Sequence, residues 1–323
     1  MTRIGFIGGG GIAHRHLHVL NDFDDVELAA VADPARAAET AAEFGMTPYD
    51  GHEAMLDAEH LDAVYVCVPP FAHGAIETDL AERGLPFFVE KPLALDLDTA
   101  EQTAAAVEAA GVVTAVGYHW RYMSHVEVAK GLLDDRPARL VQGYWLGDTP
   151  PPAWWHRRDG SGGQMVEQTT HVFDLARHLV GEAVSVSAAG GRTDRAAFPD
   201  LDVHDATAAL ITFASGAVGT FASTCLLGWT HRVGLHLFGD GLAVEVGEHE
   251  TMIDVGQGRP VTPSAHDPVV AEDRDFVDAV AGGEDRVRVP YAEALRTHRL
   301  TLAAQRALET GQTVTLEPSP THA

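Results

Sequence analysis

Short apolar runs and amphipathic stretches alternate along the first third of the chain. The apolar runs predict buried strands over residues Ile4–Ile7, Val26–Ala32, Ala63–Val68, Phe87–Val89 and Val112–Val116. The stretches between them predict helices over residues Ile12–Asn21, Ala35–Phe44, His73–Arg83 and Asp96–Ala110. Short apolar strands that alternate with helices are typical of a parallel, doubly wound α/β sheet.

This alternation ends at about Trp120. Further strands are predicted over residues Val141–Trp145, Ser185–Ala189, Ala206–Phe213, Ala217–Cys225 and Val233–Phe238. A helix with the apolar period of Val166, Phe173, Leu175 and Leu179 lies between them, and a late helix over Tyr291–Glu309 ends at Gly311. We therefore expect a nucleotide-binding domain over residues 1–120 and an α+β domain with a large, mainly antiparallel open sheet over residues 121–323.

One uncharged stretch, Ala208–Trp229, is long enough to cross a bilayer. It contains several Thr, Ser and Gly residues, and Ser215-Gly216 forms a turn signal at its centre. Two strands of a hairpin explain the stretch better than a membrane span does.

Charge and cysteine content narrow the function classes. The chain carries 47 Asp and Glu against 22 Lys and Arg, a net charge of −25, which disfavours binding to nucleic acid or to an anionic membrane surface. Only two of the basic residues are lysines, Lys91 and Lys130. Two cysteines cannot make a disulfide framework, and the N-terminus has no basic-then-apolar leader, so we expect an acidic cytoplasmic protein.

The first candidate site is the turn Gly8-x-Gly10-x-x-Ala13, which also contains Gly11 and Ile12 and joins the first strand to the first helix. Glycines here permit a tight turn and a close approach to a pyrophosphate, which would lie at the helix N-terminus. Asp33 ends the second strand, where an acid bonds the ribose hydroxyls and repels a 2′-phosphate. The pattern predicts dinucleotide binding and favours NAD over NADP, although Arg36 could accept the phosphate.

Two further segments stand at strand ends, where open α/β sheets bind ligands: Val66–His73 and Phe87–Pro92. With the glycine turn, the Pro-x-x-x-His loop and the Glu90-Lys91-Pro92 tripeptide resemble the glucose–fructose oxidoreductase, inositol dehydrogenase and rhizopine-catabolism (Gfo/Idh/MocA) family. The resemblance covers essentially the whole chain. It implies that Lys91 bonds the reacting oxygen near the nicotinamide. The other residues expected at the cofactor are Pro69, Phe71, His73, Glu90 and His119.

A third segment, Gly162–Asp174, carries the remaining chemistry. On one continuous helix, Glu167, His171 and Asp174 would share a face. The resemblance makes His171 the proton-transfer residue; Glu167 replaces the more usual Asp, so it either reaches the substrate or orients His171 or Lys91. Asp174 is expected to be a supporting residue. Carboxylates and an imidazole at this spacing could also bind zinc, but hydride transfer needs no metal, and we expect none.

Other polar and aromatic residues are candidates for substrate binding. Arg121 lies where the first domain ends, and Trp154 and Trp155 follow a proline run. Tryptophan faces suit sugar rings, but these two side chains could equally pack a loop. His14, His16 and His18 alternate on a helix and cannot share one face, so a solvated or packing role is expected for them.

These features together predict an NAD-dependent oxidoreductase that transfers a hydride between nicotinamide and a sugar, sugar derivative or cyclitol, working as a homodimer or homotetramer through its open sheet. Two alternatives share the motifs: a glycosidase that uses bound NAD transiently, and a non-catalytic regulator that binds NAD and a sugar. The joint presence of Lys91 and His171 argues against the regulator.

Overall fold

The computed structural model describes residues 1–317, and the chain divides into two compact units. The first comprises Met1–Tyr122 and Asp267–Leu295, and the second comprises Met123–His266 and the residues from Arg296 onward. The first division falls close to the expected boundary at residue 120. Residues 267–295, however, belong to the first unit, whereas the sequence placed them in the second. Their helix buries Phe276 and Val277, and an amphipathic pattern does not specify which sheet the apolar face covers.

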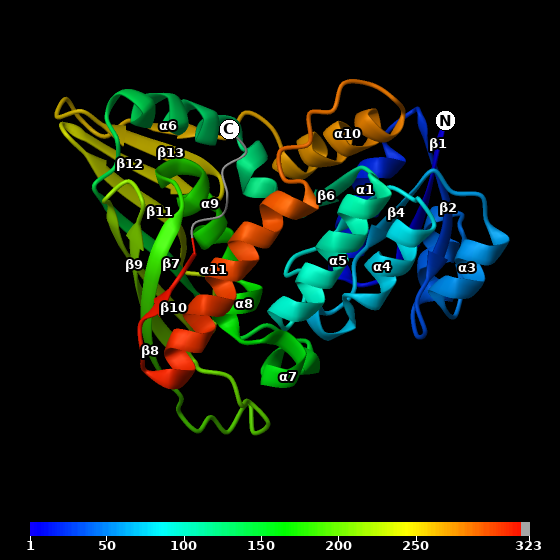
Figure 1. Ribbon diagram of the computed structural model, residues 1–323, viewed down its shortest axis with the longest axis horizontal. Coiled ribbons are helices and arrows are strands. Elements are labelled where there is room, and N and C mark those ends of the chain that lie inside the picture. Colours follow the sequence, from blue (N-terminus) through cyan, green and yellow to red (C-terminus); the bar gives the residue numbers. More distant parts are fainter. Residues whose placement is uncertain (318–323) are drawn as a thin grey trace. The chain divides into compact units, whose positions relative to one another are not determined.

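The first unit contains a six-stranded parallel sheet in the order β3-β2-β1-β4-β5-β6 (Figure 1). Its strands are β1 (Thr2–Ile7), β2 (Val26–Ala32), β3 (Thr47–Tyr49), β4 (Ala63–Val66), β5 (Phe87–Val89) and β6 (Thr114–Val116). This order confirms the doubly wound prediction. The short edge strand β3 escaped it, since its apolar run is too brief to stand out.

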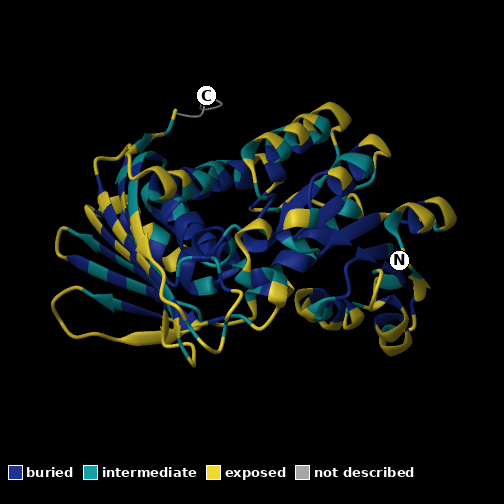
Figure 2. Ribbon diagram, turned by 90° about the horizontal axis from the view of Figure 1, so that it is seen from below, coloured by how far each residue is buried: buried dark blue, intermediate teal, exposed yellow. Residues whose placement is uncertain are grey.

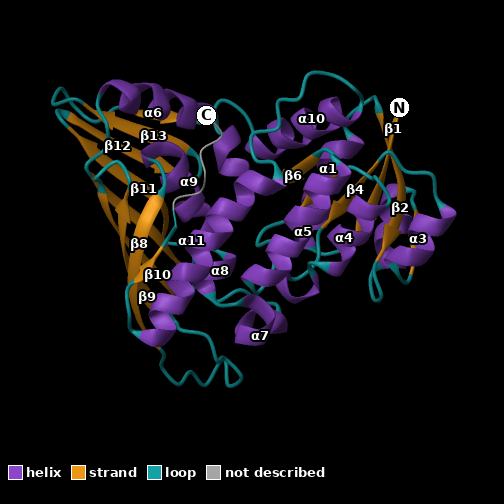
Figure 3. Ribbon diagram, in the orientation of Figure 1, coloured by secondary structure: helices purple, strands orange, loops and turns teal. Residues whose placement is uncertain are grey.

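Helices cover both faces of this sheet (Figure 3). They are α1 (Gly11–Asn21), α2 (Ala37–Phe44), α3 (His52–Ala58), α4 (Ala75–Glu82), α5 (Leu97–Ala110) and α10 (Pro268–Val280). Neighbouring residues of one strand enter different cores: Tyr65 packs with Phe6 and Phe276, whereas Val64 and Val66 pack with Phe87. Burial on both faces explains why these strands are apolar throughout rather than alternating.

The second unit contains a nine-stranded sheet in the order β14-β13-β12-β11-β7-β10-β9-β8-β15. Its strands are β7 (Leu140–Asp148), β8 (Ala183–Gly191), β9 (Ala206–Phe213), β10 (Val218–Leu227), β11 (Arg232–Gly239), β12 (Leu242–Gly247), β13 (Glu250–Asp254), β14 (Val261–Pro263) and β15 (Val314–Thr315). All pairs are antiparallel except β7 with β10. The predicted, mainly antiparallel sheet is confirmed. It also contains four strands, β12 to β15, that were not predicted from the sequence.

One face of this sheet packs against helices and the other is open. The second unit's helices are α6 (Ser124–Asp135), α7 (Arg158–Ser161), α8 (Gln164–Glu167) and α9 (Thr170–Val180), together with most of α11 (Tyr291–Thr310). Figure 2 shows exposed positions along the strands, and β10 alternates buried and exposed residues almost strictly. Such alternation is expected of a sheet covered on one side only.

The uncharged stretch Ala208–Trp229 forms the predicted hairpin. Strands β9 and β10 pair in antiparallel register, with Thr212 opposite Val218, and Gly216 in the turn has φ +82°. Over residues 1–317, no helix has both the length and the apolar character that a membrane span requires.

Candidate cofactor and active site

The glycine turn between β1 and α1 is closed toward the sheet and open on its other side. Gly8 has φ +99°, and a Cβ there would lie 2.3 Å from the carbonyl oxygen of Cys67. A Cβ at Gly11 would meet nothing within 4 Å, and one at Gly10 would only approach Arg36, at 3.9 Å. The N-cap residue Gly10 makes no side-chain capping bond, so the first-turn N–H groups of α1 are available to an anion.

Asp33, directly after β2, is held firmly beside this turn. Its carboxylate accepts bonds from the backbone N–H of Gly9, Ala35 and Arg36, each at 2.8 Å. Burial alone would raise the pKa of Asp33, but the three N–H donors lower it below its usual value. The carboxylate is therefore charged at neutral pH and bonds the backbone of the glycine turn.

The Pro69–His73 loop follows β4, with a short 3-10 turn over Pro70–Ala72. Phe71 is 55% exposed, whereas His73 is buried and its Nδ1 lies 2.6 Å from Oε1 of Glu77. The Nε2 atom of His73 is also buried and makes no hydrogen bond within residues 1–317. This Nε2 is therefore a buried polar atom that a bound ligand could satisfy.

Lys91 follows β5 at the carboxyl edge of the sheet. Its backbone N–H donates to Oε2 of Glu90 at 3.1 Å, and the N–H of Glu90 donates to the carbonyl of Val66 at 2.9 Å. Burial alone would raise the pKa of Glu90, but the bond from His16 and the nearby positive charges lower it. A Cβ at Gly117 would lie 2.4 Å from Oε1 of Glu90, so the glycine leaves room for this carboxylate.

Two residues predicted for ligand binding lie at the end of the first unit: His119 is half-buried and Arg121 is buried. Burial, reinforced by the charge of Arg15, lowers the pKa of His119 to about 4, so its imidazole is neutral. The guanidinium of Arg121 lies 3.0 Å from Glu293, and its carbonyl accepts a bond from Arg288. These contacts hold Arg121 within the first unit.

In the second unit, the expected single helix is two helices. Helix α8 ends at Glu167 and α9 begins at Thr170, so Glu167 and His171 do not share a continuous helical face. The hydroxyl of Thr169 lies 3.2 Å from the carbonyl of Gln164 and 2.7 Å from the hydroxyl of Ser223 on β10. This side-chain bonding competes with the helical pattern at the break, and a periodicity argument does not detect it.

The break gives Glu167, His171 and Asp174 different partners. Glu167 accepts a 2.7 Å bond from the indole N–H of Trp155, which is itself only 1% exposed. His171 is buried and stacks on Trp145, with ring centroids 5.9 Å apart. Asp174 accepts a 2.6 Å bond from the hydroxyl of Thr297.

The two tryptophans share one small core but are buried to different extents. Trp155 belongs to a small core with Leu201, Val203 and Cys225, and the half-buried Trp154 packs against that core. This favours packing over ring stacking for Trp155, whose part in a site would be to orient Glu167.

Three features of the first unit fit a bound dinucleotide. The glycine turn is open, the ionised Asp33 lies beside it, and the buried Nε2 of His73, after β4, makes no hydrogen bond within residues 1–317. The fold and this site define a dinucleotide-binding α/β protein. Residues 2–118 match the family model described as "Oxidoreductase family, NAD-binding Rossmann fold", and residues 137–244 match "GFO/IDH/MocA C-terminal domain". The chain belongs to the Gfo/Idh/MocA family of NAD-binding oxidoreductases.

Characterised relatives extend over most of the chain. Inositol 2-dehydrogenase of Rhizobium meliloti is 29% identical, with 82% of each chain covered. The scyllo-inositol 2-dehydrogenase (NAD(+)) of Bacillus subtilis is 26% identical, covering 98% of this chain and 96% of its own. Among solved structures, levoglucosan dehydrogenase in complex with NADH superimposes with a TM-score of 0.87 at 22% identity over 98% and 99% of the two chains, which shows a shared fold.

Two buried side chains that bond predicted site residues, His16 to Glu90 and Glu77 to His73, were not expected from the sequence. Asp273 bonds His16 in turn, and Glu272 lies beside these two residues. A histidine on the apolar face of α1 was the one available signal. Besides Glu90, its partner is Asp273 on α10, a helix that was not predicted from the sequence.

Proposed function

We propose that this oxidoreductase oxidises a CH–OH group of a sugar, sugar derivative or cyclitol, or reduces the corresponding carbonyl, with NAD. The observation that carries the proposal is Lys91, a strand-end lysine whose backbone is bonded to a buried carboxylate in the NAD-binding unit. The substrate class rests on the relatives named as dehydrogenases of inositol and levoglucosan.

In this proposal, Lys91 holds the reacting oxygen and stabilises the negative charge that develops on it. His171 accepts the hydroxyl proton as general base during oxidation and returns it during reduction. Glu167, fixed by Trp155, bonds a neighbouring substrate hydroxyl. The pyrophosphate would be held by the glycine turn, Gly8, Gly10, Gly11, Ile12 and Ala13, and the adenosine ribose by Asp33. The remainder of the cofactor would contact Pro69, Phe71, His73, Glu90 and His119. Bound NAD supplies the hydride acceptor.

Purified protein incubated with NAD and a panel of aldoses, cyclitols and nucleotide sugars tests the function. We expect NADH to accumulate in proportion to substrate consumed with at least one member. Hydrolysis of glycosides without net NADH would instead support the glycosidase, and ligand binding without turnover would support the regulator.

Exchanging the acid beside the glycine turn is expected to change cofactor preference. In Asp33→Ser with Ala35→Arg, the serine can still accept from the N–H of Gly9, while the added guanidinium can pair with a 2′-phosphate. We expect the ratio of kcat/KM for NADP to that for NAD to rise by about 100-fold or more. Ala35→Arg alone is the matched control. A wild-type protein that already prefers NADP would contradict the assignment of NAD.

We also propose that copies of this chain associate through the open face of the second sheet. Leu210 and Val218 on that face are 52% and 44% exposed, and they lie in an uncharged stretch of a chain with net charge −25. An apolar surface of this kind suits burial against a second copy. Sedimentation equilibrium should give a multiple of 34.5 kDa, and a monomer at micromolar concentration would contradict the proposal.

The buried free thiols of Cys67 and Cys225 support a cytoplasmic location.

A further inference from the structure

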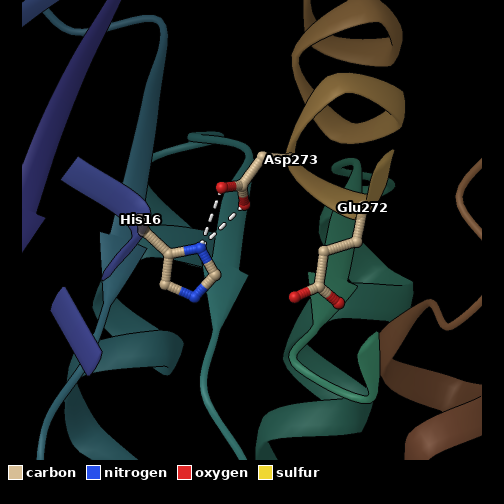
Figure 4. A group of neighbouring side chains, drawn as sticks. All are labelled: His16, Glu272 and Asp273. Carbon is tan, nitrogen blue, oxygen red and sulfur yellow. Dashed lines mark hydrogen bonds and ion pairs between the residues drawn. The ribbon is translucent and has the colours of Figure 1, made fainter. Parts of the chain in front are cut away.

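Three ionisable side chains from two distant segments meet in the core of the first unit (Figure 4). His16 comes from α1, and Glu272 and Asp273 come from α10. His16 and Asp273 are 0% exposed and Glu272 is 2% exposed. Within residues 1–317 this is the one group of three His, Cys, Asp or Glu residues close enough to share an ion.

The bonds of His16 define its charge. Its Nδ1 lies 2.8 and 3.0 Å from the two carboxylate oxygens of Asp273, and its Nε2 lies 3.2 Å from Oε1 of Glu90. An ionised carboxylate only accepts hydrogen bonds, so a His16 that bonds Asp273 and Glu90 as carboxylates carries a proton on both ring nitrogens. Burial raises the pKa of Asp273, and the charge of and bond from His16 oppose this rise. Burial alone would lower the pKa of His16, but the charges of and bonds to Asp273 and Glu90 raise it well above its usual value. His16 is therefore an imidazolium between two carboxylates.

Glu272 is the member of the cluster whose surroundings favour the neutral form. Its carboxyl group faces His16 in Figure 4, and both of its oxygens are buried without a hydrogen bond inside the described chain. Burial raises the pKa of Glu272 well above its usual value; Asp273 and Glu90 add to this, and the charges of His16 and Arg15 oppose it. With Glu272 protonated, the positive charges of His16, Lys91 and Arg15 face only the charges of Asp273 and Glu90. Tyr65, Cys67 and His119 complete the titratable surroundings and are neutral.

We propose that His16 is a positioning residue for catalysis: as an imidazolium it ties α10 to Glu90 and thereby keeps Glu90 ionised and fixed beside Lys91. The chain of contacts runs from Asp273 through His16 to Glu90, whose other oxygen accepts a bond from the backbone N–H of Lys91. This inference rests on the proposed role of Lys91. Helix α1, whose N-terminus is proposed to bind the pyrophosphate, would thereby also orient Lys91.

The test measures Lys91 directly and needs no substrate. Because Lys91 and Lys130 are the chain's two lysines, trace acylation with acetic anhydride at a series of pH values, followed by peptide mass spectrometry, reports Lys91 with Lys130 as internal control. In His16→Gln, Glu90 loses the cation that keeps it ionised and takes up a proton, so Lys91 loses a neighbouring negative charge. We expect the midpoint of its acylation curve to move down by about one pH unit.

Glu90→Gln removes the same charge with little change of shape, so it keeps the test open if His16→Gln does not fold. It should produce the same shift, and the double variant should shift no further, because both changes act through one carboxylate. His18→Gln, on the exposed side of α1, should leave the curve in place. A Lys91 curve unchanged in His16→Gln or Glu90→Gln, or shifts that add in the double variant, would overturn the proposal.

The substitution Glu272→Gln tests whether Glu272 is neutral in the buried cluster. An acid whose folded pKa is raised contributes stability below its unfolded pKa and loses it as the pH rises, and glutamine has no proton to lose. We expect the variant's Tm at pH 8 to exceed that of the wild type by about 2–4 °C, with the gain vanishing near pH 4 and the Lys91 curve unmoved. A shifted Lys91 curve would show that Glu272 is ionised. Stoichiometric zinc that His16→Gln releases would also overturn the imidazolium, because metal ligation needs a neutral nitrogen.

A substrate panel without turnover would contradict the proposed function and leave the acylation result standing. Where turnover is found, His16→Gln should lower kcat/KM by about tenfold or more while the Kd for NAD changes by no more than about threefold.

Discussion

Lys91→Met is expected to lower kcat by about 100-fold or more, because the substitution removes the one positive group proposed to stabilise charge on the reacting oxygen. Methionine approximates the length and volume of the lysine stem, so the change is chiefly one of charge and hydrogen bonding. The Kd for NAD should stay within about threefold of the wild type, since the glycine turn and Asp33 lie on other strand ends. Steady-state kinetics and calorimetric titration of NAD measure the two quantities.

Lys130→Met is the matched control, because it removes the chain's other lysine from α6 in the second unit. Its activity should equal that of the wild type. If Lys91→Met kept more than about a tenth of wild-type activity, the lysine would not be the group that stabilises the developing charge. A loss of NAD binding in proportion to the loss of activity would make Lys91 a cofactor residue instead.

His171→Ala is expected to slow oxidation by about 100-fold or more and to remove the rising limb of its pH–rate profile. Oxidation needs the neutral imidazole to accept the hydroxyl proton, so the wild-type rate should increase with pH through the range where histidines titrate, about 6.5 for an unperturbed side chain. For carbonyl reduction the sign reverses, because the protonated imidazole donates, and the rate should fall over the same range. Initial rates measured in both directions between pH 5 and 10 provide the comparison.

The rising limb of the wild-type pH–rate profile does not by itself identify the general base, because titration of Lys91 could produce a similar limb. His231→Ala, an exposed histidine of the same unit, is the control and should keep both rate and profile. If His171→Ala kept the wild-type midpoint and slope, proton transfer would move to Lys91, and His171 would be a residue that orients the substrate.

The glycine turn and the strand ends were predictable from the sequence because their determinants are local. A short apolar strand, a turn that only glycine permits at Gly8, and an acid at the end of the next strand follow one another within about one βαβ unit. Parallel strands bring their carboxyl ends to one edge, so the sequence alone places Asp33, His73 and Lys91 on that edge. The hairpin at Ser215-Gly216 is local for the same reason.

Only the tertiary structure decided which groups contact one another across long separations. The shared helical face of Glu167 and His171 was predicted by extending the helical period through residues 168 and 169. The helix breaks there, where Thr169 bonds the hydroxyl of Ser223, 54 residues further along the chain. His16 was expected to be solvated or packed, yet its charge is set by Asp273, 257 residues away. Sequence periodicity records which face of an element is apolar. It does not record which distant polar group that face will meet, and in a buried site that partner determines the protonation state.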